Sequence, residues 1–160
     1  MFSIKEINYT DFLLEEFSFK IGDYATYNRY YKIELTLNNS ILNIGLQIAF
    51  FGIEPQIELF KNNIIIGAGN KVFAYNLSGE LLKEYLLEPA FYEFKLADEY
   101  ILVIGELDVF LLDNLYNKIW SKDLNEIICS CKIDNSTIIL EDFNKKIIYL
   151  DLLTGNPKIC

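Results

Sequence analysis

The sequence predicts an all-β fold, in which three repeated antiparallel sheets follow an N-terminal hairpin and a short helix. Three observations support this prediction. Eleven Tyr and twelve Phe accompany many Ile residues, and aromatic and β-branched side chains favour pleated, half-buried sheets. The second observation is an internal repeat within residues 57–160, and the third is a polar turn that closes each copy of this repeat.

The repeat begins with an apolar strand. Ile64, Ile101 and Ile138 start equivalent apolar runs, and 37 residues separate each of them from the next. A second apolar strand follows in each copy and ends at a residue that favours tight turns, namely Asn76, Asp113 and Asp151. We therefore expect strands at residues 64–67, 72–76, 101–105, 109–113, 138–141 and 147–151.

Shorter apolar segments fill the chain between the copies. They lie at residues 81–87 with 91–96, and at 118–124 with 127–133. Each repeat then holds four antiparallel strands, which is the content of one propeller blade. Three blades cannot close a ring, since propellers typically have four to eight.

The turns of the repeat carry a further pattern. One runs from Asp151 to Thr154 and Gly155, and another runs from Asp113 to Trp120. Together they resemble the Asp-x-x-Thr-Gly-x-x-x-Trp signature of degenerate β-propeller repeats of the pyrroloquinoline-quinone (PQQ-like) type. The resemblance covers about residues 57–160. Only the third copy keeps Thr-Gly, only the second keeps the tryptophan, and the first has Asn76 with a turn one residue shorter.

This resemblance implies that Trp120 docks between neighbouring blades and is largely buried. It does not imply a bound quinone, because the enzymes of that family use complete rings with many more blades than this chain has. Many relatives with such repeats act as scaffolds that bind other proteins. We therefore expect no cofactor.

The first 56 residues show a different pattern. Residues 10–17 predict a short helix that starts at Thr10 or Asp11, because either side chain can cap a helix N-terminus. Residues 30–37 and 41–50 predict a hairpin. Pro55 then marks the junction between an N-terminal cap, residues 1–56, and the repeats, residues 57–160, within one compact unit. The open blade edges also permit a homo-oligomer.

The charge of the chain restricts its partners. It carries 14 Lys and Arg against 23 Asp and Glu, a formal net charge of −9. Nucleic acid is a poor match, because phosphate binding requires a basic surface. A basic protein is a better match, although acidity can also serve solubility alone. No apolar run is long enough to span a membrane and the N-terminus lacks a signal peptide, so we expect a cytoplasmic protein.

Catalysis is not expected. The chain has no His, the commonest general base and metal ligand, and its three Cys cannot form a zinc site by themselves. Two acidic pairs, Glu106 with Asp108 and Glu141 with Asp142, resemble a glycosidase pair in composition. Acids beside turns are usually solvated, so we expect neither a catalytic nor a metal site.

Acidic residues recur at one end of the predicted sheets. Successive loops of a meander alternate between two ends, so the loops between the second and third strands of each blade share an end with the connections between blades. This end, the loop end, collects seven acids that we expect to bind a partner, or to form only a solvated rim: Glu88, Glu106, Asp108, Asp123, Glu126, Glu141 and Asp142. The opposite end, the turn end, carries mostly Asn, Ser and Gly with a few charges, among them Asp98, Glu99 and Asp134.

A second candidate surface lies near the N-terminus. It combines Tyr24, Tyr27, Tyr30 and Tyr31 with Arg29. Tyrosine and arginine are frequent in the regions of interfaces that contribute most to affinity. Half-buried packing in a sheet is the alternative role for these tyrosines.

These features favour two functions from the class of binding proteins. The first is an acidic immunity protein or antitoxin that neutralises a basic toxin, possible targets including a nuclease, since opposite charges speed association. The alternative is a general protein-interaction scaffold or a propeller fragment that assembles with itself. A carbohydrate-active or calcium-dependent domain is a third, remote option.

Overall fold

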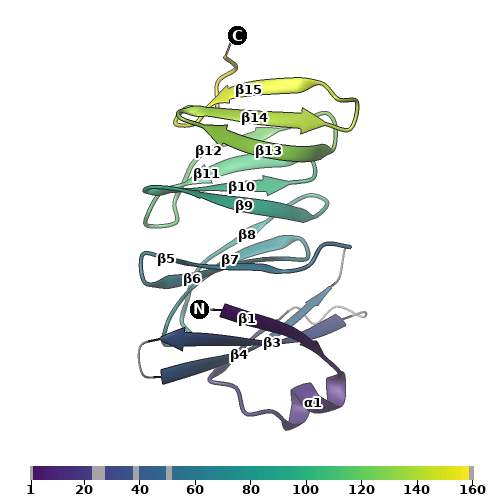
Figure 1. The fold of residues 1–160 in the computed structure, drawn as a ribbon, viewed down its shortest axis with the longest axis vertical. Coiled ribbons are helices and arrows are strands. Elements are labelled where there is room, and N and C mark those ends of the chain that lie inside the picture. The colour runs from purple at the N-terminus through teal and green to yellow at the C-terminus, as the bar shows by residue number, and fades with distance from the viewer. Residues whose placement is uncertain (1, 23–27, 38–39, 50–51, 159–160) are drawn as a thin grey trace.

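The structure is a computed structural model that describes residues 2–22, 28–37, 40–49 and 52–158. Four sheets are stacked face to face along the long axis of the molecule, in chain order from the N-terminus to the C-terminus (Figure 1). The fold is therefore all-β, as predicted, but the number of blade-like sheets is four and not three.

The first two repeats form complete four-stranded antiparallel meanders. The first consists of β5 (Gln56–Phe60), β6 (Asn63–Ala68), β7 (Lys71–Asn76) and β8 (Leu81–Leu86). The second consists of β9 (Phe91–Ala97), β10 (Tyr100–Gly105), β11 (Asp108–Leu112) and β12 (Lys118–Asp123). The strands expected from the repeat are confirmed in both.

The last sheet departs from the expected four strands. It consists of β13 (Ile128–Asp134), β14 (Thr137–Asp142) and β15 (Ile147–Asp151). Beside β15, Pro157 forms a single antiparallel bridge with Leu150, and the Lys158 N–H donates to the Tyr149 carbonyl oxygen at 2.9 Å. Proline has no N–H to donate, which limits the ladder at this point.

The fourth sheet lies at the N-terminus, where the sequence predicted only a cap. The predicted hairpin is confirmed as β3 (Asn28–Leu37) and β4 (Ser40–Ala49). Two unpredicted strands complete the sheet: β1 (Phe2–Ile7) lies antiparallel to β3, and β2 (Phe19–Gly22) lies parallel to β4. Their sequence signal is weak, because β1 is mostly exposed and β2 has only four residues.

A short helix, α1 (Tyr9–Leu14), lies on the outer side of this first sheet (Figure 1). The helix was predicted, but it begins earlier than expected. Asn8 is the N-cap, and its Oδ1 accepts a hydrogen bond from the Asp11 N–H at 2.8 Å. Asparagine is among the best N-cap residues, which explains the earlier start.

Three apolar layers hold the four sheets together. Alternate residues of a strand point to opposite faces, so a central strand between two sheets must be apolar on both. Ile64, Ile101 and Ile138 are fully buried and each packs in the layer shared with the preceding sheet. Their neighbours Ile65 and Leu102 pack against the following sheet. The predicted equivalence of the three isoleucines is therefore confirmed.

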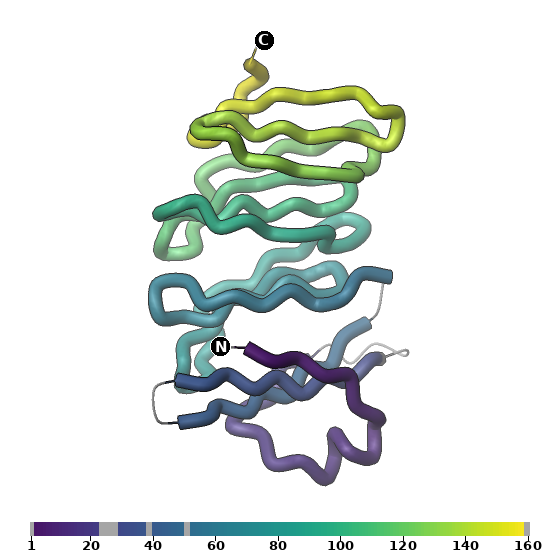
Figure 2. The backbone as a smooth tube through the Cα atoms, viewed as in Figure 1, coloured from purple at the N-terminus to yellow at the C-terminus, as the bar shows by residue number. Residues whose placement is uncertain are grey.

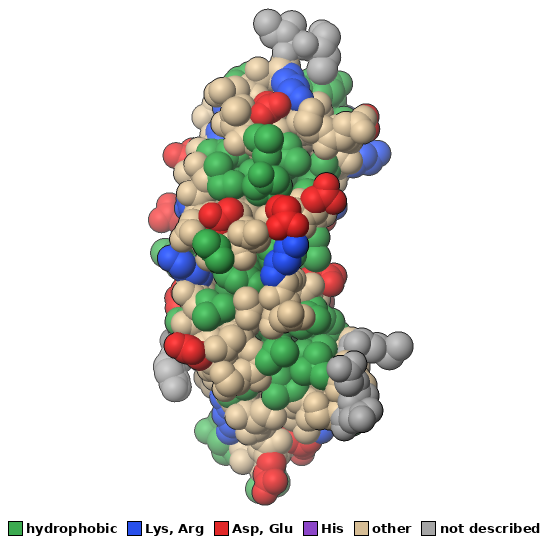
Figure 3. Space-filling model, turned by 90° about the vertical axis from the view of Figure 1, so that its left-hand side faces the viewer, with side chains coloured by type: hydrophobic (Ala, Val, Ile, Leu, Met, Phe, Trp, Pro, Cys, Tyr) green, Lys and Arg blue, Asp and Glu red, His purple; other side chains and the backbone are tan. Residues whose placement is uncertain are grey.

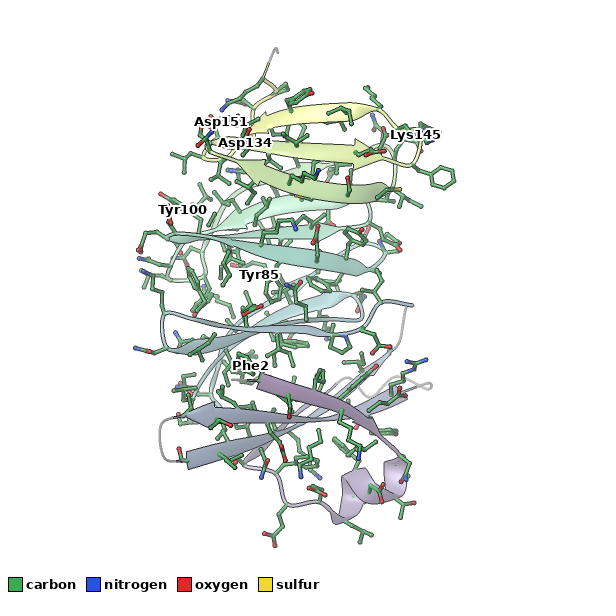
Figure 4. The ribbon with its side chains drawn as sticks, viewed as in Figure 1. Phe2, Tyr85, Tyr100, Asp134, Lys145 and Asp151 are labelled. Atoms are coloured by element: carbon green, nitrogen blue, oxygen red, sulfur yellow. The ribbon has the colours of Figure 1, made fainter. Side chains whose placement is uncertain are left out.

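The backbone path separates the two ends of the stack. Figure 2 shows hairpin turns along both sides of the molecule, whereas the connections between successive repeat sheets lie along one side only. In Figure 4, Asp134 and Asp151 lie at one end of the last sheet and Lys145 lies at the other. The loop end and the turn end are thus opposite sides of one elongated body.

Candidate functional site

Backbone hydrogen bonds fix the shape of the loop end. The Phe91 N–H donates to the Gly69 carbonyl oxygen at 2.8 Å, and 37 residues later the Ile128 N–H donates to the Glu106 carbonyl oxygen at 3.0 Å. Each bond joins the loop of one sheet to the first strand of the next. The loops are therefore held side by side without the help of their acidic side chains.

Three of the predicted acids surround one shallow depression at this end. Its volume is about 400 Å³, and its lining consists of Glu88, Asp108 and Asp123 with Leu86, Leu107 and Leu124. No ion pair involves these three carboxylates within the described part of the chain. The three leucines were not predicted, and their only signal in the sequence is that each lies within two residues of an acid.

Asp108 is the most unusual of these acids. It is half-buried, and its Oδ1 is inaccessible and has no hydrogen-bond partner. Burial raises the pKa of this carboxyl to about 6; Lys118 opposes the shift, and Asp123 and Glu88 add to it. A Cβ on Gly105 would lie only 1.9 Å from Oδ1, so a glycine is needed for this close approach.

The other predicted acids of the loop end differ among themselves. Glu126 is exposed and lines a second depression next to Asp123, while Glu106 is half-buried in its loop. Glu141 points to the outer face of the last sheet, since it alternates with the buried Leu140. Asp142 does not belong to an exposed rim. Only 4% of it is exposed, and its Oδ1 accepts the Lys146 N–H at 2.9 Å.

At the turn end the acidic side chains build the turns themselves. Asp113 Oδ1 accepts the N–H groups of Leu115 and Asn117 at 2.9 and 2.8 Å. Burial opposes ionisation of Asp113, but these hydrogen bonds outweigh it and lower its pKa. Asp151 Oδ1 accepts from the N–H and hydroxyl of Thr154, and Lys158 and Thr154 lower the pKa of Asp151.

The same end connects neighbouring sheets through aromatic side chains. Trp120 Nε1 donates to the Leu152 carbonyl oxygen at 2.9 Å. Its ring lies against Gly155, which has a φ of +67° and where a Cβ would come within 2.6 Å of the indole. Trp120 therefore docks on the next sheet as the resemblance implied, and its side chain is partly buried against the apolar layer between the two sheets.

The predicted tyrosine surface does not form one face. Tyr24 and Tyr27 lie outside the described residues. Tyr30 packs against α1, with ring centroids 5.0 Å from Phe12, whereas Tyr31 points to the opposite face of β3 and is only 2% exposed. The Tyr31 hydroxyl donates to Glu54 at 2.8 Å, and burial raises its pKa to about 12.

Other kinds of site are not indicated. Within residues 2–22, 28–37, 40–49 and 52–158, no group of three or more Cys, Asp or Glu side chains is arranged to hold a metal ion. The helix found in these ranges is too short to cross a membrane. In Figure 3, hydrophobic side chains remain visible on the surface between acidic and basic ones.

Sequence comparison identifies no relatives, since no family model and no curated protein matches the chain. Structural comparison does find similar folds. The computationally designed Ika4 protein superposes with a TM-score of 0.55 and 15% identity, over 69% of this chain and 75% of that protein.

Two natural proteins give similar agreement. The WD40 domain of Neurospora crassa Pan2 matches with a TM-score of 0.53 and 14% identity, over 65% of this chain and 36% of that domain. A europium-containing methanol dehydrogenase matches with a TM-score of 0.55 and 14% identity, over 68% of this chain. The chain spans only about a quarter of that enzyme, since 24% of it is covered. These neighbours are of the propeller type, so the fold is propeller-like.

Proposed function

We propose that the chain is a non-catalytic protein-interaction scaffold that binds a basic protein segment at its loop end. The observation that carries this proposal is the depression lined by Glu88, Asp108 and Asp123, three acids that form no ion pair among the described residues. The propeller-like fold is consistent with it, because such sheets can present loops on a rigid body.

The chemistry of the depression suits a lysine or arginine side chain. A cation placed in the depression would relieve the repulsion between Asp108, Glu88 and Asp123. Leu86 and Leu107 would contact the methylene groups of the same side chain, since such side chains have an apolar stem and a charged head. The site therefore favours a basic segment over a neutral one.

The narrower hypothesis of an immunity protein against a basic toxin depends on charge alone. Neither the fold nor the comparisons support it, so the scaffold is the better proposal. The lack of His supports a function without catalysis. The contact of Trp120 with Gly155 supports repeats of the PQQ-like type.

The experiment measures binding of a short oligolysine peptide by fluorescence anisotropy at several salt concentrations. The test variant combines Glu88→Gln, Asp108→Asn and Asp123→Asn. The matched control combines Asp98→Asn, Glu99→Gln and Asp134→Asn at the turn end, which removes the same charge. We expect binding to weaken at least about tenfold in the test variant and less than about twofold in the control. Equal effects in both would reject the loop end as the binding site.

A further inference from the structure

The outer face of the last sheet is chemically like an interface between two sheets. Ile139 on β14 alternates with the buried Ile138 and Leu140, so it points away from the preceding sheet. It pairs directly with Tyr149 on β15, which lies on the same outer face. Ile147, two residues from Tyr149, shares this face and is 42% exposed.

The repeat shows what this face is suited to contact. The residues equivalent to Ile139 are Ile65 and Leu102, and both are fully buried against the following sheet. In Figure 1 no described helix or strand lies beyond the outer face of the last sheet, although the described C-terminal segment rises past it at one side. The repeat thus places a sheet-packing residue where the described chain offers no sheet to pack on it.

A backbone carbonyl oxygen of the last sheet also differs from its equivalents in the two preceding sheets. The carbonyl oxygens of Gly69 and Glu106 each accept an N–H from the first strand of the following sheet. The equivalent residue in the last sheet, 37 positions after Glu106, is Phe143, which is 71% exposed. No described N–H donates to the Phe143 carbonyl oxygen.

The outer face of the first sheet differs, because aromatic side chains pack on it and charged side chains lie beside them. Phe12 and Phe17, on α1 and the segment after it, lie within 2.9 Å of the position that a Cβ on Gly45 would take. Beside them the face is polar, because Lys32 on β3 forms ion pairs with Glu15 and Glu34. The outer face of the first sheet is therefore partly covered by α1, whose Leu13 and Leu14 are themselves 56% and 79% exposed, whereas no described helix lies over the outer face of the last sheet.

We propose that a second copy of this chain packs its own last sheet against this face, in a two-fold symmetric dimer. A two-fold contact uses the same surface on both partners and closes on itself. In a head-to-tail contact the outer face of the last sheet would meet α1 and not an open sheet. The face is also self-complementary in charge, since Lys132 and Glu141 both lie on it and symmetry can bring each to the other copy.

The width of the face indicates the size class of the interface. It is three strands wide, which places the interface in the class below about 1,200 Å² that is typical of weak, reversible complexes. We therefore expect a dimer that forms as concentration rises. The loop end is a different side of the molecule, so this inference does not depend on the proposed function.

Sedimentation equilibrium of the full chain, from about 5 to about 500 μM, tests the proposal. Ile147→Glu should raise the dimer dissociation constant at least about tenfold, because it buries a charge against an apolar partner. The matched control is Ile41→Glu, at an exposed strand isoleucine on the outer face of the first sheet, which is 62% exposed; it should leave dimerisation within about twofold of the parent.

A second variant guards against loss of folding. Ile139→Thr keeps the β-branched shape while adding a hydroxyl at the centre of the face, and it should also weaken the dimer. Circular dichroism verifies that each variant is folded. A chain that stays monomeric at every concentration would overturn the proposal. So would a dimer that Ile147→Glu and Ile139→Thr leave intact, or one that Ile41→Glu weakens as strongly.

Discussion

Asp108 at the loop end uses its carboxylate in the opposite way to Asp113 and Asp151 at the turn end. At the turn end, Asp113 and Asp151 accept backbone N–H groups and their pKa values are lowered. At the loop end, Asp108 has an oxygen without a partner and its pKa is raised to about 6. Aspartate therefore stabilises the turns at the turn end, whereas Asp108 lowers the stability of the fold at the loop end.

This difference between the aspartates indicates where the chain can carry a binding function. The loops of the loop end are shaped by backbone bonds such as that from Phe91 to Gly69, so most of their acids are not needed for the fold. The turns at the other end depend on their Asp and Asn side chains, which leaves fewer of them for a partner. Variants at equivalent positions of the two ends test this difference.

The largest expected effect lies at the turn end, at Trp120. Its replacement by Ala removes the hydrogen bond to Leu152 and the packing on Gly155, and it should lower the free energy of unfolding by about 3 kcal/mol. Urea denaturation followed by circular dichroism measures the change. Lys83, which pairs with Ala74 as Trp120 pairs with Leu111, is the control. Lys83→Ala should cost less than about 0.5 kcal/mol, and a similar loss from both would discredit the role of the indole.

The next prediction compares the effect on stability of replacing Asp113 at the turn end and Asp123 at the loop end. Asp113→Ala should lower the free energy of unfolding by about 1 to 2 kcal/mol, because the N–H groups of Leu115 and Asn117 lose their acceptor. Asp113→Asn should restore most of this, since Asn76 already fills the equivalent position of the first repeat. At the loop end, the exposed Asp123→Ala should change stability by less than about 0.5 kcal/mol. Thermal denaturation compares the three variants, and a loss at Asp123 as large as that at Asp113 would contradict the comparison.

A smaller effect of opposite sign is expected at Asp108. Because its folded-state pKa is raised, the folded protein holds a proton that the unfolded chain has released, and stability falls as pH rises from about 4 to about 6. Asp108→Asn should therefore increase stability at pH 7 by about 1 kcal/mol, a value reduced for partial solvent screening. Denaturation at pH 4 and pH 7 measures it. A variant that is destabilised at pH 7 would show that the carboxylate supports the fold.

The sequence predicted the repeat sheets because their signal is periodic. Ile64, Ile101 and Ile138 recur at a constant spacing, and Asn76, Asp113 and Asp151 close equivalent turns. The first sheet could not be predicted in full, since β1 is an exposed edge strand and β2 pairs in parallel with a distant strand. The acids of the loop end could be assigned to one side, but their burial could not. Asp142 and Asp108 look alike in sequence, and only packing makes one a turn residue and the other a carboxylate without a hydrogen-bond donor.

The most direct test of the loop end as a binding site is an NMR titration of the Asp108 carboxyl carbon, with and without the oligolysine peptide. The structure predicts a pKa of about 6 for the protein alone, because the group is half-buried beside Asp123 and Glu88. A bound cation should lower it by about one unit or more, while the pKa values of Asp113 and Asp151 should not move. A pKa below about 4.5 without peptide, or one that the peptide leaves unchanged while binding occurs, would contradict a docking site around this carboxylate.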